Sequence, residues 1–423
     1  MAERDKATDG TRHVLVLNQH GDNRGDEAAF RAMFAGIAER ASGPVRFTVL
    51  HQFAGGRVDV RVSHDVRWIS LVPTPLEAAR ISAYAALLAL GIRARALLGP
   101  WGRSVIDAYE GADVALSAPG GPYFGDPYAS HELVHWFYVW LAHRHRLPTM
   151  LYAPSVGPFR KRALNPVRRR LFPRFRAIAV REEVSLGYLR ALLRGRGPEP
   201  VLAMDSALQR PIPPAERASY FTGERTALAH RFLVGVSAIQ WSFPGHPDPA
   251  GAHARYESAL VDALLHVHRE RSAHFLLVPQ LYGMRHSDVP YLRALAARLP
   301  ADVSWELVDP AADSDHQQRV FGMCDMYVAS RYHPQVFAIN AAVPGICIHY
   351  QHKALGFIER FGLGRLAFPI DALDRARLLA AVDEVLERRD ALSEGIARAL
   401  PGMRAASARS SELAVALLEG ARR

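Results

Sequence analysis

The sequence predicts an α/β protein made of two successive doubly wound domains. Short apolar runs alternate with longer segments of helical periodicity, which is the pattern of parallel strands joined by crossover helices. The alternation stops at the proline-containing stretch 209–225 and then starts again. With 423 residues the chain is also too long for one hydrophobic core of average size. These three observations favour two domains over one.

The first domain is predicted to span residues 1–215. Each of its apolar runs is short enough for a buried strand. Strands are expected at His13–Asn18, Phe47–Gln52, Val66–Leu71, Ala112–Ser117, Pro148–Ala153, Ala177–Arg181 and Val201–Met204. Helices are expected from about Asp26 to Ala41 and over Val184–Leu193.

The second domain is predicted over residues 216–370, followed by a helical segment over 371–423. Its strands are expected at Phe232–Ser237, His274–Val278, Ser304–Val308, Met326–Ala329 and Gly345–His349. The closing segment has helical periodicity with a break near Glu394–Gly402, where Pro401 would interrupt a helix. We therefore expect two C-terminal helices.

The chain carries 52 basic and 42 acidic side chains, a formal net charge of +10 that favours anionic partners. The excess is concentrated in Phe159–Arg176, which holds eight basic residues and no acidic one. A solvated arginine-rich helix face is one interpretation. Peripheral contact with an anionic membrane, or with a lipid-linked phosphate acceptor, is another. Nucleic acid is not expected as a partner, because no RNA-binding signature, zinc finger or convincing helix-turn-helix accompanies the charge.

Cysteine content and the N-terminus predict a cytoplasmic location. The two cysteines, Cys324 and Cys347, are too few for a disulfide framework or a four-thiolate zinc site. Residues Met1–Arg12 are polar and lack the apolar core of a secretory signal. The apolar stretch Ile81–Leu98 is interrupted by two arginines, so it reads as an amphipathic or buried helix and not as a membrane span.

Arginine and histidine side chains stand where predicted strands end. Arg331 and His333 follow the predicted strand at 326–329 in the second domain, and Arg181 stands at the end of the run Ile178–Val180 in the first domain. Ligands of open α/β sheets bind beyond the carboxyl ends of the strands. A guanidinium can grip phosphate or carboxylate, and an imidazole can move a proton. The pattern therefore favours a phosphorylated, anionic substrate.

Three loops in the first half of the chain are further candidates for binding the substrate. The loop after the first strand contains Asn23 and leads to Asp26, which could cap the next helix or act with Glu27 as a base. Gly120 and Gly121 follow another strand and leave N–H groups that could bind an anion, although a plain tight turn explains them equally well. The loop Ser155–Pro158 offers a hydroxyl after a third strand. No P-loop or GxGxxG motif supports a nucleotide site in these loops.

His131, Glu132 and His135 match the HExxH pattern of zinc proteases. Histidines at i and i+4 share one helix face and can hold a metal. The match falls in an aromatic, histidine-rich crossover helix, which is a poor place for a protease cleft. We therefore expect no metal site.

Several of these segments, in this order, resemble motifs of the polysaccharide pyruvyltransferase family, between about Asn18 and Leu363. The similar elements are Asn23–Ala28, Gly120–Gly121 with Asp126, Ser155–Pro158, Arg181–Ser185, Asp205, and Ser330–His333 with Ala338, Pro344 and Lys353. Pro119 stands where that family has a further glycine. The resemblance implies two Rossmann-like domains in a GT-B-like arrangement with C-terminal helices. The first domain would serve the acceptor and the second the donor.

The resemblance also implies transfer of pyruvate from phosphoenolpyruvate to a sugar, with formation of a cyclic ketal. Catalysis would fall to His333, Arg331 and Asp26, and substrate binding to Arg181, Asn23, Glu27, Gly120, Gly121, Ser155 and Lys353. The acceptor would be a free, lipid-linked or nucleotide-linked glycan, and neither metal nor nicotinamide would be required. The alternative of the same fold class is a GT-B glycosyltransferase that uses a nucleotide sugar. A glycan-binding protein without catalysis is a third alternative, because fold alone does not decide function.

Overall fold

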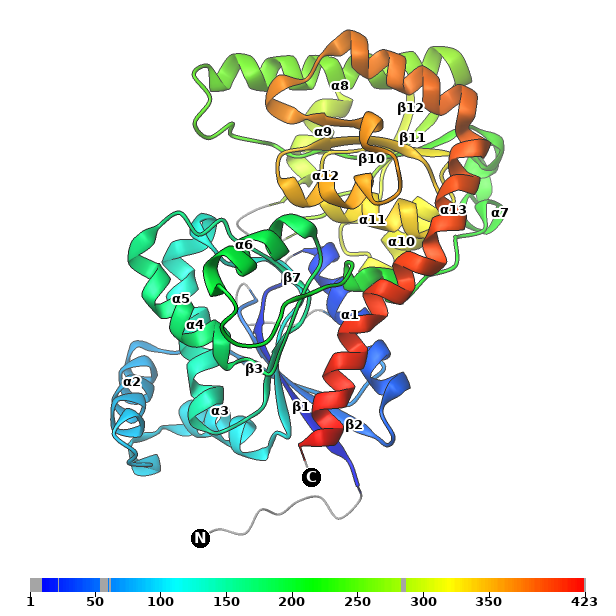
Figure 1. Ribbon diagram of the computed structural model, residues 1–423. Coiled ribbons are helices and arrows are strands. Elements are labelled where there is room, and N and C mark those ends of the chain that lie inside the picture. The colour runs from blue at the N-terminus through cyan, green and yellow to red at the C-terminus, as the bar shows by residue number, and fades with distance from the viewer. Residues whose placement is uncertain (1–9, 22, 54–59, 61, 283–286, 422–423) are drawn as a thin grey trace. The chain divides into compact units, whose positions relative to one another are not determined.

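The computed structural model describes residues 10–21, 23–53, 60, 62–282 and 287–421. Most of the N-terminal stretch considered for a secretory signal, residues 1–9, lies outside this part of the chain. The described residues group into two compact units (Figure 1). Unit 1 takes residues 10–21, Ala29–Arg210 and 405–421, and unit 2 takes 23–28 and Pro211–Arg404.

Unit 1 is built on a seven-stranded parallel sheet with the order β3-β2-β1-β4-β6-β8-β9. The strands are β1 (Arg12–Gln19), β2 (Val45–His51), β3 (Val66–Ser70), β4 (Val114–Ser117), β6 (Thr149–Leu151), β8 (Ala177–Val180) and β9 (Val201–Leu202). Every strand predicted for the first half of the chain is confirmed. Two further short strands, β5 (Gly120–Phe124) and β7 (Pro154–Val156), pair with each other beyond the ends of β4 and β6. They were not predicted, because their sequences lack the apolar run of a central strand.

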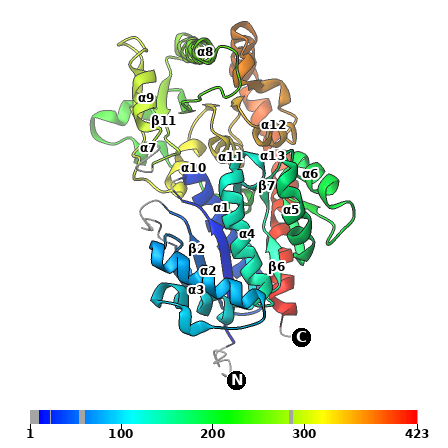
Figure 2. The same cartoon turned by 90° about the vertical axis from the view of Figure 1, so that its left-hand side faces the viewer.

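Helices cover both faces of this sheet, as a reversal of strand order at β1 and β4 requires. They are α1 (Arg24–Arg40), α2 (Pro75–Ala89), α3 (Pro100–Gly111), α4 (Ala129–Arg144), α5 (Asn165–Leu171) and α6 (Glu183–Leu193). In Figure 1, α3 and α4 lie on one face and α1 on the other; the view of Figure 2 brings α2, α3 and α4 in front of the sheet. Val14–Leu17 and their neighbouring strands are buried on both faces, which explains their continuous apolar runs.

Unit 2 contains a six-stranded parallel sheet with the order β12-β11-β10-β13-β14-β15. The strands are β10 (Leu233–Ser237), β11 (His274–Leu277), β12 (Ser304–Leu307), β13 (Met326–Ala329), β14 (Gly345–His349) and β15 (Ala367–Pro369). The helices are α7 (Arg217–Tyr220), α8 (Pro249–Arg271), α9 (Val289–Ala296), α10 (Ser314–Gly322), α11 (Tyr332–Asn340) and α12 (His352–Glu359). The five strands predicted here are confirmed, and β15 is an edge strand too short to be recognised. The α/β fold class is thus confirmed in both units.

The C-terminal segment differs from its prediction. The segment α13 (Arg375–Gly420) consists of two helices joined at a kink, which confirms the predicted number, but the kink lies at the non-helical Arg388, and the second helix passes through Glu394–Gly402 with Pro401 inside it. The expected break near Glu394–Gly402 is therefore wrong. Apolar side chains such as Leu378 and Val382 are buried in unit 2, and Leu418 is buried in unit 1. Packing of this kind outweighs the loss of one hydrogen bond at a proline.

Among the described residues, no helix is both long and apolar enough to cross a membrane. Only the first half of the stretch Ile81–Leu98 belongs to α2, which ends at Ala89 and of which Ile81, Tyr84, Ala85 and Leu88 are buried; a separate short 3-10 helix covers Arg95–Leu97. One face of α2 therefore packs into unit 1, as the amphipathic interpretation predicts.

A buried ionic cluster joins α4 to α5 in unit 1. Arg168 is fully buried and contacts Glu132 through Nε and Nη2, at 2.8 and 2.6 Å. Its Nη2 also donates to Asp126 at 3.0 Å, and Trp136 donates to Glu132 at 3.1 Å. The central glutamate of the HExxH match is therefore the counter-ion of a buried arginine.

The two histidines of the HExxH match do not share a site with that glutamate. Nε2 of His135 lies 2.9 Å from Nε2 of His20 in unit 1, and His131 is exposed. Burial lowers the pKa of His20 to about 3, so its imidazole is neutral at pH 7. No group of three histidine, cysteine or carboxylate side chains within the described part of the chain could hold a metal ion.

We predict that Arg168→Met destabilises unit 1 by about 3–5 kcal/mol, because it leaves the buried carboxylate of Glu132 and the partly buried carboxylate of Asp126 without their cation. Arg190 pairs with Glu199 at an exposed position and supplies the matched control. Arg190→Met should cost less than about 1 kcal/mol. Urea unfolding followed by circular dichroism measures both; equal losses would contradict a structural role for the Arg168 cluster.

Candidate active site

The end of β13 delivers the arginine and histidine that the sequence analysis singled out. Ser330 follows the strand, donates its backbone N–H to Ser237 at 2.7 Å, and its hydroxyl lies 2.7 Å from that of Tyr256. Arg331 has extended backbone angles and precedes α11, which starts at Tyr332. His333 thus lies in the first turn of that helix and is 5% exposed. Both side chains belong to the carboxyl edge of the unit 2 sheet, where ligands of such sheets bind.

A buried aspartate orients the guanidinium of Arg331. Nη2 of Arg331 donates to Oδ1 of Asp288, and Oδ2 of Asp288 accepts the N–H groups of Gln280 and Leu281, each at 3.0 Å. Burial acts to lower the pKa of Arg331, but Asp288 and Tyr350 outweigh it, so the pKa is raised and the side chain stays charged. The Nε group of Arg331 is buried and has no hydrogen-bond partner among the described residues. A charged donor in this state is suited to an anionic ligand.

The Asn23–Glu27 segment belongs to this same unit. Asn23 forms an antiparallel bridge with Leu281, and the N–H of Arg24 donates to the carbonyl of Gln280 at 3.1 Å. The guanidinium of Arg24 lies 3.8 Å from the centre of the Tyr282 ring. These contacts fix the start of α1 on the loop that follows β11.

Gly25 lies directly against His333. A Cβ atom at this glycine would come within 1.7 Å of Nδ1 and 2.5 Å of Cβ of the histidine, so no other residue fits without displacing the imidazole. The N–H of Gly25 donates to Oδ1 of Asn23 at 2.8 Å. The structure thus brings together two segments that the sequence placed more than three hundred residues apart.

The two acidic residues after Gly25 have different surroundings. Glu27 accepts from Arg24 at 2.7 Å and from the N–H of Ser314, at the start of α10, at 3.2 Å. Asp26 lies in the first turn of α1 and is 9% exposed. The suggested capping role of Asp26 is wrong, because the helix begins at Arg24 and the side chain of Asn23 accepts the N–H of its second residue.

Lys353 and Tyr350, which both follow β14, lie near the end of β13 in unit 2. Lys353, near the start of α12, has its Nζ 5.5 Å from the centre of the Tyr332 ring. Tyr350 interacts with Arg331 and raises its pKa, as described above. Cations and aromatic rings therefore adjoin the end of β13.

In unit 1, strand β7 and the segments after β8 and β9 also meet. Arg181 donates from Nε to Ser155 at 2.9 Å and from Nη1 to Asp205 at 2.6 Å, and all three residues are buried. The carbonyl of Asp205 accepts the hydroxyl of Ser407 in α13 at 2.6 Å. Gly120 has a φ of 127°, which favours glycine, and starts β5 beside β7. Gly121 follows it in the same strand.

Among the predicted residues, the structure thus gathers Asn23, Asp26, Glu27, Arg331, His333 and Lys353 in unit 2, and Gly120, Gly121, Ser155 and Arg181 in unit 1. Their roles stay predictions. Sequence reasoning missed Asp288, the partner of Arg331. In the sequence, Asp288 is recognisable only as a carboxylate just before the helix that starts at Val289–Pro290. Carboxylates are common at such positions, so this one does not stand out.

Comparisons with known proteins identify the family and the fold. The model of the family described as polysaccharide pyruvyl transferase matches residues 57–352, which include Arg181, Arg331 and His333 but not the Asn23–Glu27 segment. The amylovoran biosynthesis protein AmsJ of Erwinia amylovora is 25% identical over 304 residues, 68% of each chain.

Solved structures of GT-B proteins share the fold. A putative UDP-N-acetylglucosamine 2-epimerase from Listeria monocytogenes superposes with a TM-score of 0.58 at 10% identity, over 92% of this chain and 91% of its own. The Anabaena protein Alr3699/HepE in complex with UDP-glucose gives 0.54 at 15% identity, over 96% and 98%. At these identities the likeness shows the fold alone. The family match covers more than half of the chain, and the protein therefore belongs to the polysaccharide pyruvyl transferase family.

Proposed function

We propose that this pyruvyltransferase of polysaccharide biosynthesis takes its pyruvyl group from phosphoenolpyruvate and forms a cyclic ketal on a sugar. The observation that carries the proposal is the contact of Gly25 with His333, a buried histidine two residues from the partly buried, charged Arg331. A permanent cation beside a histidine is what a substrate with a carboxylate and a phosphate needs. The acceptor we envisage is a glycan, either free or linked to a lipid or a nucleotide.

The residues have distinct roles in this proposal. Arg331 grips an anionic group of phosphoenolpyruvate through charge-assisted hydrogen bonds, and Asp288 holds the guanidinium in place. His333 donates a proton to the methylene carbon of the donor. Asp26 accepts the proton of the attacking hydroxyl, a role less suited to Glu27 because Arg24 and Ser314 occupy both of its oxygens.

The proposed reaction balances without a redox partner. Protonation of the methylene carbon makes a methyl group and leaves a cation-like centre at the neighbouring carbon. One sugar hydroxyl attacks that centre and loses its proton. The carbon–oxygen bond to phosphate then breaks, inorganic phosphate leaves, and a second hydroxyl closes the ring and releases another proton. Arg181, Ser155, Gly120, Gly121, Asn23 and Lys353 stay proposed binding residues.

We also propose a cytoplasmic location, which the two free, buried cysteines support.

Phosphate release from phosphoenolpyruvate, in the presence of a panel of sugars and sugar nucleotides, tests the function. His333→Ala should lower kcat by about 10²–10⁴-fold with little change in KM for phosphoenolpyruvate, since the imidazole acts in the chemical step. Arg331→Lys should raise that KM, because a point charge replaces a planar fork. Arg255, exposed in α8, gives the control Arg255→Ala.

The function would be refuted by consumption of a nucleotide sugar as glycosyl donor while phosphoenolpyruvate remains unchanged. Turnover of His333→Ala at the wild-type rate would remove the role of the histidine alone.

Gly25→Ala tests the contact that carries the proposal. The new methyl group must displace the imidazole of His333, so kcat should fall by about 10²-fold or more while the donor's KM changes little. Gly402 in α13 has open space around it, and Gly402→Ala should keep wild-type kinetics. Thermal melts of both variants exclude loss of the fold as the cause. Undiminished kcat in Gly25→Ala would show that the imidazole position does not matter.

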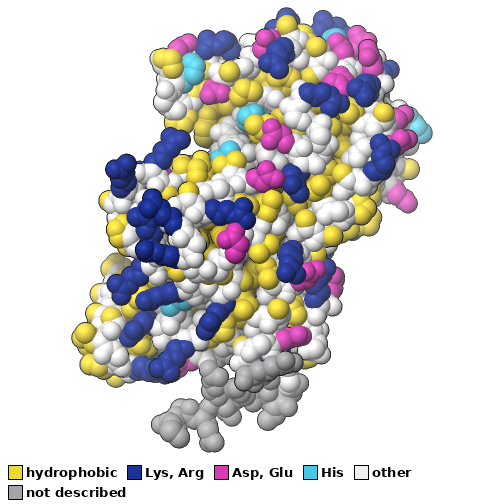
Figure 3. Space-filling model, viewed as in Figure 1, with side chains coloured by type: hydrophobic (Ala, Val, Ile, Leu, Met, Phe, Trp, Pro, Cys, Tyr) yellow, Lys and Arg dark blue, Asp and Glu magenta, His cyan; other side chains and the backbone are white. Residues whose placement is uncertain are grey.

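The arginine-rich stretch supports a further partner. Arg168 is buried, whereas Arg160, Lys161, Arg162, Arg169, Arg170, Arg174 and Arg176 are all exposed. Figure 3 shows Lys and Arg side chains gathered on the face of unit 1 that carries α5. We propose that this basic face contacts anionic lipid.

Replacement of Arg169, Arg170 and Arg174 by serine should weaken binding to phosphatidylglycerol vesicles by on the order of 100-fold at low salt, at about 1 kcal/mol for each cation. Co-sedimentation measures the loss. The same replacement at Arg255, Arg269 and Arg293, which are exposed in unit 2, serves as the charge-matched control. Equal loss in both triple variants would speak against a dedicated membrane face.

A further inference from the structure

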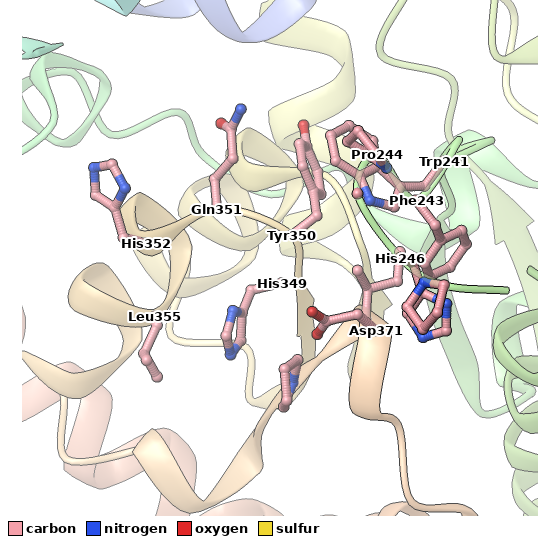
Figure 4. A pocket seen from close by; sticks show the side chains of 14 residues that line it. Trp241, Phe243, Pro244, His246, His349, Tyr350, Gln351, His352, Leu355 and Asp371 are labelled. Carbon is pink, nitrogen blue, oxygen red and sulfur yellow. The ribbon is translucent and has the colours of Figure 1, made fainter. Parts of the chain in front are cut away.

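Unit 2 contains a pocket of about 740 Å³ at the carboxyl edge of its sheet (Figure 4). Its walls come from the loop after β10, the turn between β14 and α12, and the segment after β15. β10 and β14 are the two neighbours of β13 in the sheet, and β13 delivers Arg331. The pocket has the size of an ordinary small-molecule site.

Aromatic side chains form one part of the wall. The rings of Trp241 and Tyr350 lie 4.5 Å apart at 38°, and both are partly exposed. Phe243 is buried beneath the same loop. The apolar face of a ring-shaped ligand can pack on such a surface.

The polar part of the wall contains histidine, glutamine and aspartate side chains. Of the fourteen described residues that line the pocket, none is lysine or arginine, and Asp371 is a carboxylate that faces His349 (Figure 4). Burial lowers the pKa of His349, with Asp371 acting in the opposite direction, so this imidazole is neutral at pH 7. A phosphate or carboxylate placed here would find no lysine or arginine among the described residues of the wall. Hydroxyl groups would find imidazole, amide and carboxylate partners.

Tyr350 connects this pocket to the proposed donor site. It lines the pocket, and it also interacts with the guanidinium of Arg331. A ligand packed on Tyr350 would therefore lie beside the residue that we propose to bind phosphoenolpyruvate.

We propose that this pocket binds a neutral sugar ring of the acceptor glycan, stacked on Trp241 and Tyr350 and hydrogen-bonded to Asp371. That the bound sugar belongs to the acceptor rests on the proposed function. The assignment places a sugar subsite in unit 2, whereas the family resemblance implies an acceptor side in the first domain.

Binding can be measured without turnover. Saturation-transfer difference NMR on the full-length protein, with methyl glycosides of glucose, galactose, mannose and N-acetylglucosamine as probes, should detect at least one of them. Trp241→Ala should weaken that binding by about tenfold or more, because the stacking surface is lost. Asp371→Asn keeps the shape but removes the charged acceptor, and should weaken it by about three- to tenfold.

Trp305→Ala is the matched control, since Trp305 is 38% exposed on β12 and does not line the pocket. It should bind the probes as the wild type does. Circular dichroism melts establish that the variants fold. Sugar binding that survives in both Trp241→Ala and Asp371→Asn, or failure of every probe to bind, overturns the proposal. Binding of UDP or phosphoenolpyruvate that depends on Trp241 overturns it as well.

Kinetics separate this proposal from the function on which it rests. Trp241→Ala should raise KM for the acceptor about tenfold and leave KM for phosphoenolpyruvate unchanged. If phosphoenolpyruvate is never consumed but glycosides still bind in a Trp241-dependent manner, the proposed reaction fails and the sugar site stands. If phosphoenolpyruvate is consumed and Trp241→Ala leaves the acceptor's KM unchanged, the sugar site fails and the reaction stands.

Discussion

The candidate site depends on one steric constraint, the absence of a side chain at residue 25. The backbone of Gly25 lies so close to His333 that any Cβ atom would overlap the imidazole. This approach lets the first turn of α1 join unit 2, where Asn23 and Arg24 bond to the loop after β11. The glycine needs no unusual backbone angle here. It is required for space, because a Cβ atom here would overlap the imidazole of His333.

The buried charges around this contact explain why its geometry is stable. Asp288 satisfies two backbone N–H groups with one oxygen and Arg331 with the other, so the loop and the guanidinium hold each other in place. Buried ion pairs contribute little net stability when compared with apolar packing, but they fix orientation. In unit 1 the pairing of Arg181 with Asp205 and Ser155 has the same character, and it connects the guanidinium to β7 and to the segment after β9. Each unit thus uses an arginine at a strand end as the centre of a polar network.

Much of this was predictable, because strand ends are visible in sequence and parallel sheets place them on one edge. The apolar run at 326–329 located Arg331 and His333, and the same reasoning located Arg181. The meaning of His131, Glu132 and His135 could not be read from their spacing, since it depends on Arg168, which lies 36 positions from Glu132. Asp288 was not predicted either, because its role depends on the distant Arg331 and nothing in the neighbouring sequence distinguishes it from other loop carboxylates. Pro401 misled the prediction for α13, because tertiary packing on both sides of it decides whether the helix continues.

The central claim is that proton transfer to the methylene carbon of phosphoenolpyruvate takes place at the site formed by Gly25, Arg331 and His333. Carrying out the reaction in D₂O and examining the product by NMR and mass spectrometry tests it most directly. The account predicts one deuterium in each ketal methyl group, with one phosphate released for each ketal formed. A methyl group without deuterium, or a product that carries a new sugar in place of a ketal, would contradict it.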